Sequence, residues 1–170
     1  MPKENGRQGK TVLVLLTGAY PADAEDASFI RNEINQLAEA FDAVHVYSFD
    51  VIEGDTLPLP GNAEYKGSLK EVPRVAGLKS LTQPGSLVRA GRAFLQELRA
   101  GRLDRNVGRT LGNIFSGTRF ASAIKENLGP NDQVSAYAFW GTNGAMALPF
   151  LPGETKKTVR LHGFDLYEER

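Results

Sequence analysis

The sequence contains no cysteine among its 170 residues. This absence excludes disulfide bonds, thiolate metal sites and a cysteine nucleophile. The first ten residues are polar, and the apolar run Val12–Leu16 is too short for the core of a secretion signal. Taken together, these features lead us to expect a cytoplasmic protein.

An excess of charge of either sign is also missing. The chain has 20 Lys and Arg residues against 20 Asp and Glu residues, so bulk charge gives no reason to expect a nucleic-acid partner. The cations are unevenly placed, because eight of them lie between Ser86 and Lys125. Only Glu97, Asp104 and Glu126 offset them in and next to that stretch. The middle of the chain is therefore basic.

Two further motifs are absent. The chain has neither the spaced glycines of a dinucleotide-binding fingerprint nor the Gly-Lys-Ser/Thr end of a P-loop, which argues against NAD and ATP. Its two histidines have no third ligand at a suitable spacing, so we expect no metal and no cofactor. His45 alternates with Val44 and Val46 in an apolar run and is interpreted as a structural or surface residue.

What the chain does contain is an alternation of strand and helix patterns within one domain spanning residues 1–170. Thr11–Leu16 is a short aliphatic run typical of a strand buried on both faces. Apolar residues then recur at helical spacing, and Val44–Phe49 follows as a second strand. The apolar helical positions are Phe29, Ile30, Ile34, Leu37, Ala38 and Phe41. Such a unit normally begins a parallel α/β sheet.

The rest of the chain continues this pattern after an irregular region, residues 51–85, which holds only a short strand at Ala63–Lys66. The further predicted elements are helices at Leu87–Leu98 and Thr110–Leu128, a strand at Gln133–Trp140, a short helix at Ala145–Leu148 and a last strand at Thr158–Leu161. We therefore predict an α/β fold with an open, Rossmann-like, mostly parallel sheet flanked by helices.

Three segments directly follow predicted strands. They are Thr17–Pro21, Trp140–Gly144 and His162–Asp165. Open α/β sheets bind ligands at the carboxyl ends of their strands, so we expect these segments to converge in one crevice.

Residues in two of these segments carry a resemblance to a known family. Thr17–Pro21 followed by Ser28–Ile34 is similar to the opening of glycosyltransferase family 4 enzymes, which have the GT-B fold. Arg160–Glu168 resembles the Arg-x-His-Gly-x-Asp strand end of that family, and Val134–Trp140 resembles its preceding strand. The middle of the chain matches nothing in the family pattern.

The resemblance implies an N-terminal, acceptor-side domain of an enzyme that transfers a hexose with retention and without a divalent metal. The donor would be a nucleotide sugar and the acceptor a saccharide or a lipid-linked saccharide. The donor-binding C-terminal domain, with its paired glutamates, would lie outside this chain. Glu25 and Glu33 are separated by seven residues, as the paired glutamates of the family are, but they lie in the N-terminal rather than the C-terminal domain. We therefore interpret this spacing as coincidence. His162 corresponds to the family histidine beside the donor sugar; the alternative is a strand-end cap.

The same resemblance and the strand ends suggest substrate-binding residues, each with an open alternative. Gly18 would let a sugar or phosphate approach the backbone, or would only form a turn. Tyr20 and Trp140 would stack on a sugar ring or only pack. Thr142 and Asn143 would bind a hydroxyl-rich ligand at a helix start or only cap it. Gly163 and Asp165 belong to the family motif that contains His162, and the resemblance implies that both lie at the substrate. Asp165 would accept hydrogen bonds from acceptor hydroxyls or would only cap a helix.

Two questions stay open from the sequence. In the stretch Arg89–Arg119, apolar positions share a helix face with flanking cations, which suits peripheral contact with an anionic membrane. The alternative is a solvated helix that hides its apolar face in the core. For the function, the alternatives are a non-catalytic α/β module that binds a ligand or partner, and half of a GT-B nucleotide-sugar epimerase.

Overall fold

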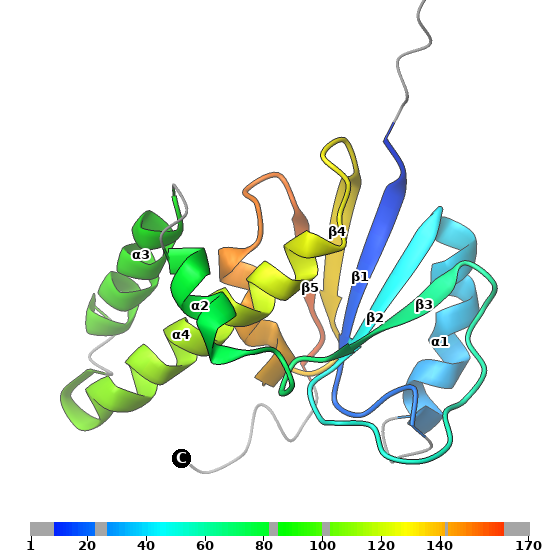
Figure 1. Cartoon of the computed structure of the whole chain (residues 1–170), viewed down its shortest axis with the longest axis horizontal. Coiled ribbons are helices and arrows are strands. Elements are labelled where there is room, and N and C mark those ends of the chain that lie inside the picture. Colours follow the sequence, from blue (N-terminus) through cyan, green and yellow to red (C-terminus); the bar gives the residue numbers. More distant parts are fainter. Residues whose placement is uncertain (1–8, 23–26, 82–84, 100–102, 142, 162–170) are drawn as a thin grey trace, which may run out of the picture.

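Five parallel strands form one sheet in the part of the chain that the computed structural model describes, residues 9–22, 27–81, 85–99, 103–141 and 143–161 (Figure 1). The strand order is β3-β2-β1-β4-β5, and every neighbouring pair is parallel. The strands are β1 (Thr11–Thr17), β2 (Ala43–Ser48), β3 (Ala63–Ser68), β4 (Gln133–Ala138) and β5 (Lys156–Val159). The predicted Rossmann-like fold class is confirmed.

Helices cover both faces of this sheet. The elements are α1 (Ala27–Ala40), α2 (Arg74–Leu81), α3 (Ser86–Arg99), α4 (Leu103–Glu126) and the 3₁₀ helix η1 (Asn143–Phe150). Figure 1 shows α1 on one side of the sheet and α2, α3 and α4 on the other, with α3 farthest from the strands. None of the described helices is long and apolar enough to cross a bilayer.

Alternation along β1 divides the core into two layers. Leu13 and Leu15 pack with the inner face of α1, whose buried residues Ile30 and Ile34 recur one helical turn apart. Val14 and Leu16 pack on the other face, with α4 and η1. Both sides of the strand are therefore buried, as its continuous aliphatic sequence predicts.

The main correction to the sequence prediction is the helix α2, which lies in a region expected to be irregular. Pro73 suggested a break in the chain, but it precedes the first turn, where its carbonyl accepts a hydrogen bond from the Ala76 amide at 3.0 Å. A proline at a helix start costs no hydrogen bond. Gly77 then allows close packing, because a Cβ there would lie 2.9 Å from the ring of Phe115 on α4.

Other differences concern element ends and one side chain. The helix expected from Thr110 already begins at Leu103, the short helix expected at 145–148 extends over 143–150, and the last strand lies two residues earlier than predicted. Phe29 was expected on the apolar face of its helix but is 52% exposed. The buried stripe of α1 repeats every four residues from Ile30, and Phe29 falls outside it.

We expect His45 to make the stability of the fold depend on pH. It lies inside β2 beside Val14 of β1 and Glu64 of β3, and its Nδ1 is buried without a hydrogen-bond partner. Burial lowers the pKa of its imidazole, and the nearby Lys66 lowers it further, whereas Glu64 and Asp132 act in the opposite direction. The folded state therefore favours the neutral ring.

We predict that the free energy of unfolding falls as the pH drops from 7.5 to 5.5. The folded pKa lies below the unfolded value of about 6.5, so the unfolded chain binds more protons in this range. The contribution of the neutral His45 ring to stability is fully present above the pKa of the unfolded chain. It is lost as the pH falls through the lower pKa that His45 has in the folded state. Urea titrations should show a smaller pH dependence for His45→Gln. An equal dependence in both proteins would contradict the role of His45, since His162 is common to both.

Candidate functional site

The strand order reverses beside β1, and this places two of the predicted segments together. β1 lies between β2 and β4, so the chain leaves β1 and β4 in neighbouring positions at the carboxyl edge. The Phe139 amide donates to the Leu16 carbonyl at 2.9 Å. A Cβ on Gly144 would lie 3.3 Å from the Leu16 Cβ, so η1 begins directly against the end of β1. This switch point is where open α/β sheets bind ligands.

The turn after β1 is fixed by its own polar groups. The Thr17 hydroxyl lies 2.9 Å from the Tyr20 carbonyl oxygen and 3.2 Å from that of Tyr47. The Gly18 carbonyl accepts hydrogen bonds from the amides of Phe49 and Asp50, at 3.0 and 2.9 Å. Gly18 therefore forms a turn that holds the end of β1 against the residues that follow β2.

The two aromatic candidates differ in exposure. Tyr20 is 1% exposed and packs in the core under α1, and burial raises the pKa of its hydroxyl, an effect that Arg31 partly offsets. Trp140 is half-buried and meets the ring of Phe139 edge to face, with centroids 5.8 Å apart. In this structure the Tyr20 ring packs, as in its sequence alternative, whereas Trp140 keeps part of its surface accessible.

A hollow of about 410 Å³ opens next to this turn. Tyr20 from the turn, Arg31 and Asn35 from α1 and the proline-containing segment 57–60 line it. It is open to solvent on one side and lies near the carboxyl end of β1. The hollow offers both apolar walls and hydrogen-bonding side chains, the combination found in small-molecule sites.

An ion pair joins the segment after β5 to α1. The Arg160 guanidinium pairs with the carboxylate of Glu33 and lies over the ring of Phe139, 4.9 Å from its centroid. The Tyr137 hydroxyl donates to the same carboxylate at 3.4 Å. Hydrogen bonding to Glu33 raises the pKa of Arg160. The carboxylate of Glu33 and the ring of Phe139 thus hold Arg160, the residue that follows β5.

Four of the eight proposed site residues lie outside the described residues. They are Thr142, His162, Gly163 and Asp165. Asn143 is described only as the first residue of η1. The structure therefore brings together Gly18, Trp140 and the start of η1 at one edge, and places Tyr20 beneath them in the core.

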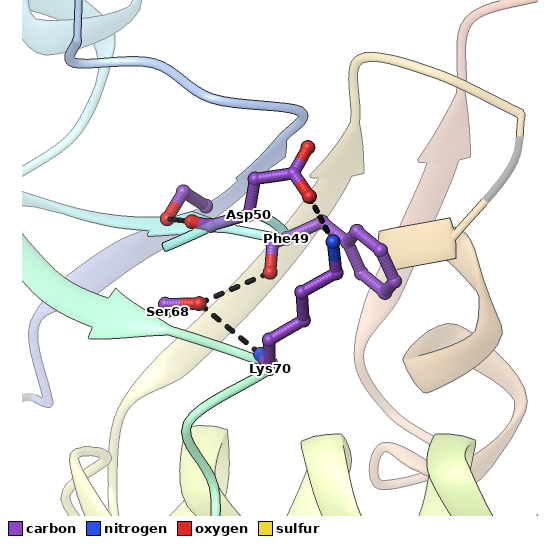
Figure 2. A network of polar contacts seen from close by, with 5 residues as sticks. Phe49, Asp50, Ser68 and Lys70 are labelled. Carbon is purple, nitrogen blue, oxygen red and sulfur yellow. Dashed lines mark hydrogen bonds and ion pairs between the residues drawn. The ribbon is translucent and has the colours of Figure 1, made fainter. Parts of the chain in front are cut away.

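A charged pair that the sequence reasoning missed lies at the same edge (Figure 2). Lys70, which follows β3, pairs with the carboxylate of Asp50, which follows β2. The ammonium also lies over the ring of Phe49, 4.9 Å from the centroid. The Ser68 hydroxyl donates to the Phe49 carbonyl at 3.0 Å and accepts from the Lys70 amide at 3.1 Å.

This pair belongs to the candidate site because the Asp50 amide is bonded to Gly18. Both charged side chains are about half exposed, at 49% each, so a ligand can reach them. A carboxylate accepts hydrogen bonds from hydroxyl groups, and an ammonium donates to hydroxyl or phosphate oxygens. The signal in the sequence was the position of Asp50 directly after a predicted strand, the same signal that singled out Gly18.

The class of protein defined so far is an open α/β domain with polar side chains at the carboxyl edge of its sheet, beside the switch point. Among the described residues, no group of three or more acidic or histidine side chains could hold a metal ion. Comparison with models of protein families, with curated proteins and with solved structures found no match for the chain. The site must therefore be interpreted from its own residues.

Proposed function

We propose that this chain is the acceptor-side domain of a retaining GT-B glycosyltransferase of the family 4 type, acting in the cytoplasm. The full enzyme transfers a hexose from a nucleotide sugar to a saccharide or lipid-linked acceptor. A second Rossmann-like domain, outside these 170 residues, binds most of the donor. The reaction requires both substrates to be held in a closed cleft between the two domains.

The observation that carries the proposal is the contact between the two segments on which the resemblance depends. Glu33 belongs to the Ser28–Ile34 segment and Arg160 begins the Arg-Leu-His-Gly run, and their side chains form an ion pair. Residues far apart in the sequence that resemble one family thus meet at the carboxyl edge of one sheet. The pairing gives Glu33 a contact with Arg160 that does not involve its spacing from Glu25.

The chemistry assigned to the described residues is binding and orientation. Asp50 and Lys70 offer an acceptor and a donor to sugar hydroxyls, and the exposed part of Trp140 offers a ring surface. His162 follows the strand end that Arg160 anchors and contacts the donor sugar near the reacting carbon. A neutral imidazole there donates a hydrogen bond to a sugar hydroxyl or accepts one from it.

We predict that His162→Ala lowers the turnover of the full-length enzyme by about 100-fold or more, the size expected when a group acting on the reacting centre is removed. Transfer and donor hydrolysis would be measured over a panel of nucleotide sugars. His45→Gln is the matched control, because it removes the other histidine of the chain from inside β2.

Three outcomes are distinguishable. Turnover of one donor that is lost in His162→Ala and kept in His45→Gln supports the proposal. Interconversion of the sugar without any acceptor would favour an epimerase instead. Absence of donor binding and turnover over the whole panel would refute the transferase and favour a non-catalytic binding module.

A further inference from the structure

The helices on one side of the sheet expose most of the large apolar side chains found at the surface. Eight of the twelve exposed large apolar residues among the described positions lie on α2, α3 and α4. They are Val75, Leu78, Leu87, Val88, Leu95, Leu98, Val107 and Leu111. Single exposed leucines are ordinary, but this concentration on three adjoining helices indicates a surface that contacts something.

The helix α3 packs two alanines against the core and exposes four large aliphatic side chains. Ala90 and Ala93 pack against the core cluster formed with α4 and η1. The α3 apolar face, which we define as Leu87, Val88, Leu95 and Leu98, is 48–66% exposed. At 100° per residue these four positions fall within an arc of about 100°. These four side chains are therefore not hidden in the core, whereas Ala90 and Ala93 of the same helix and Ile114 of α4 pack against it.

Unbalanced positive charge borders this face. Arg92 and Arg99 are exposed and lie one helical turn after Val88 and Leu95, next to them on the helix surface. From Arg74 to Phe120 the sequence has nine Lys and Arg residues against two acidic residues, Glu97 and Asp104. Because the whole chain has no net charge, this segment is basic and the remainder of the chain is acidic.

We propose that the α3 apolar face docks on the surface of an anionic phospholipid bilayer, with α3 lying in the plane of the interface. Apolar side chains inserted at the headgroup boundary and arginines beside them are the two contributions that hold such a helix at a membrane. A two-fold contact between copies of this chain would instead set Arg92 and Arg99 of each copy against the same cationic face. The bilayer supplies apolar cover and negative charge together.

Vesicle sedimentation with the 170-residue chain tests this directly. We expect binding to phosphatidylcholine vesicles that contain phosphatidylglycerol, weak binding to phosphatidylcholine alone, and weaker binding as salt rises. The double variant Arg92→Gln/Arg99→Gln should weaken partitioning about tenfold or more and reduce the salt dependence. Leu87→Gln/Leu98→Gln should weaken it by a similar factor without reducing the salt dependence.

The matched controls are Val51→Gln and Lys156→Gln, which change an exposed apolar and an exposed basic residue outside α2–α4. Both should bind vesicles like the unchanged chain, and circular dichroism should show that all variants keep the fold. No binding to anionic vesicles, or equal losses in the controls, would overturn the proposal. So would a dimer in analytical sedimentation that the leucine variant abolishes while vesicle binding is absent. The result is independent of whether the parent protein transfers a sugar.

Discussion

Gly117→Ala is expected to reduce the free energy of unfolding by about 2 kcal/mol or more, although alanine is the better helix former. Gly117 lies buried in α4 where η1 crosses it. A Cβ at this position would lie 2.3 Å from the Met146 carbonyl oxygen and 2.6 Å from the Phe150 ring. A backbone oxygen cannot rotate away as a side chain can, so η1 must shift as a unit. The loss would be measured by urea or thermal unfolding.

Gly112 provides the matched control on the same helix. It is exposed, and a Cβ there would meet no atom within 4 Å. Gly112→Ala should therefore stabilise the protein by about 0.5–1 kcal/mol, through helix propensity and a less flexible unfolded chain. Opposite signs for the two substitutions are the expected result. Stabilisation by both would show that η1 does not pack on α4 at this point.

This contact has a consequence for the candidate site. η1 begins at Asn143, directly against the end of β1, and its other end packs on α4 around Gly117. A shift of η1 would move the segment from Trp140 to Gly144 away from the turn at Gly18. The structural glycine in α4 thereby helps to set the position of η1 at the candidate site, although it lies outside that site.

The sequence predicted the sheet well because its signals are local. The run Val12–Leu16 can be buried on both faces only in a sheet that is covered on two sides. The spacing of Ile30, Ile34 and Ala38 defines the inner face of α1, the helix that covers one of these sides. The helix α2 was missed because it lies in the region 51–85, which was expected to be irregular, and contains Gly77, a residue of low helix propensity. Tertiary packing overrides that local preference where Gly77 admits the ring of Phe115.

The candidate site was predicted only in part, since side-chain pairing across strands leaves little trace in the sequence. Thr17–Pro21 and Trp140–Gly144 were identified because each follows a strong strand pattern. The pairing of Asp50 with Lys70 depends on the register of β2 and β3, and β3 is a weak strand with Glu64 and Lys66 in it. The exposed face of α3 was equally hidden, because helical periodicity shows that an apolar face exists but not where it points.

Phe120→Ala should cost about 3–5 kcal/mol of unfolding free energy, the range for removing a large aromatic side chain from a core. Phe120 is 2% exposed and lies in the cluster between the sheet, α4 and η1. Its ring meets that of Phe49 edge to face, with centroids 6.0 Å apart, and Phe49 in turn lies under the Lys70 ammonium. The substitution therefore removes core volume and also the support beneath the charged pair at the carboxyl edge.

Leu111→Ala on the same helix is the control, because Leu111 is 53% exposed and its loss should change stability by no more than about 0.5 kcal/mol. Phe120→Leu separates the two contributions of the ring. It refills most of the cavity but removes the edge-to-face contact with Phe49, so we expect a smaller loss of about 1–2 kcal/mol. Chemical denaturation of the three variants gives these values. If Phe120→Ala lost no more stability than Leu111→Ala, Phe120 would not pack in the core between α4 and the sheet. The position of Phe49 under Lys70 would then lack its support as well.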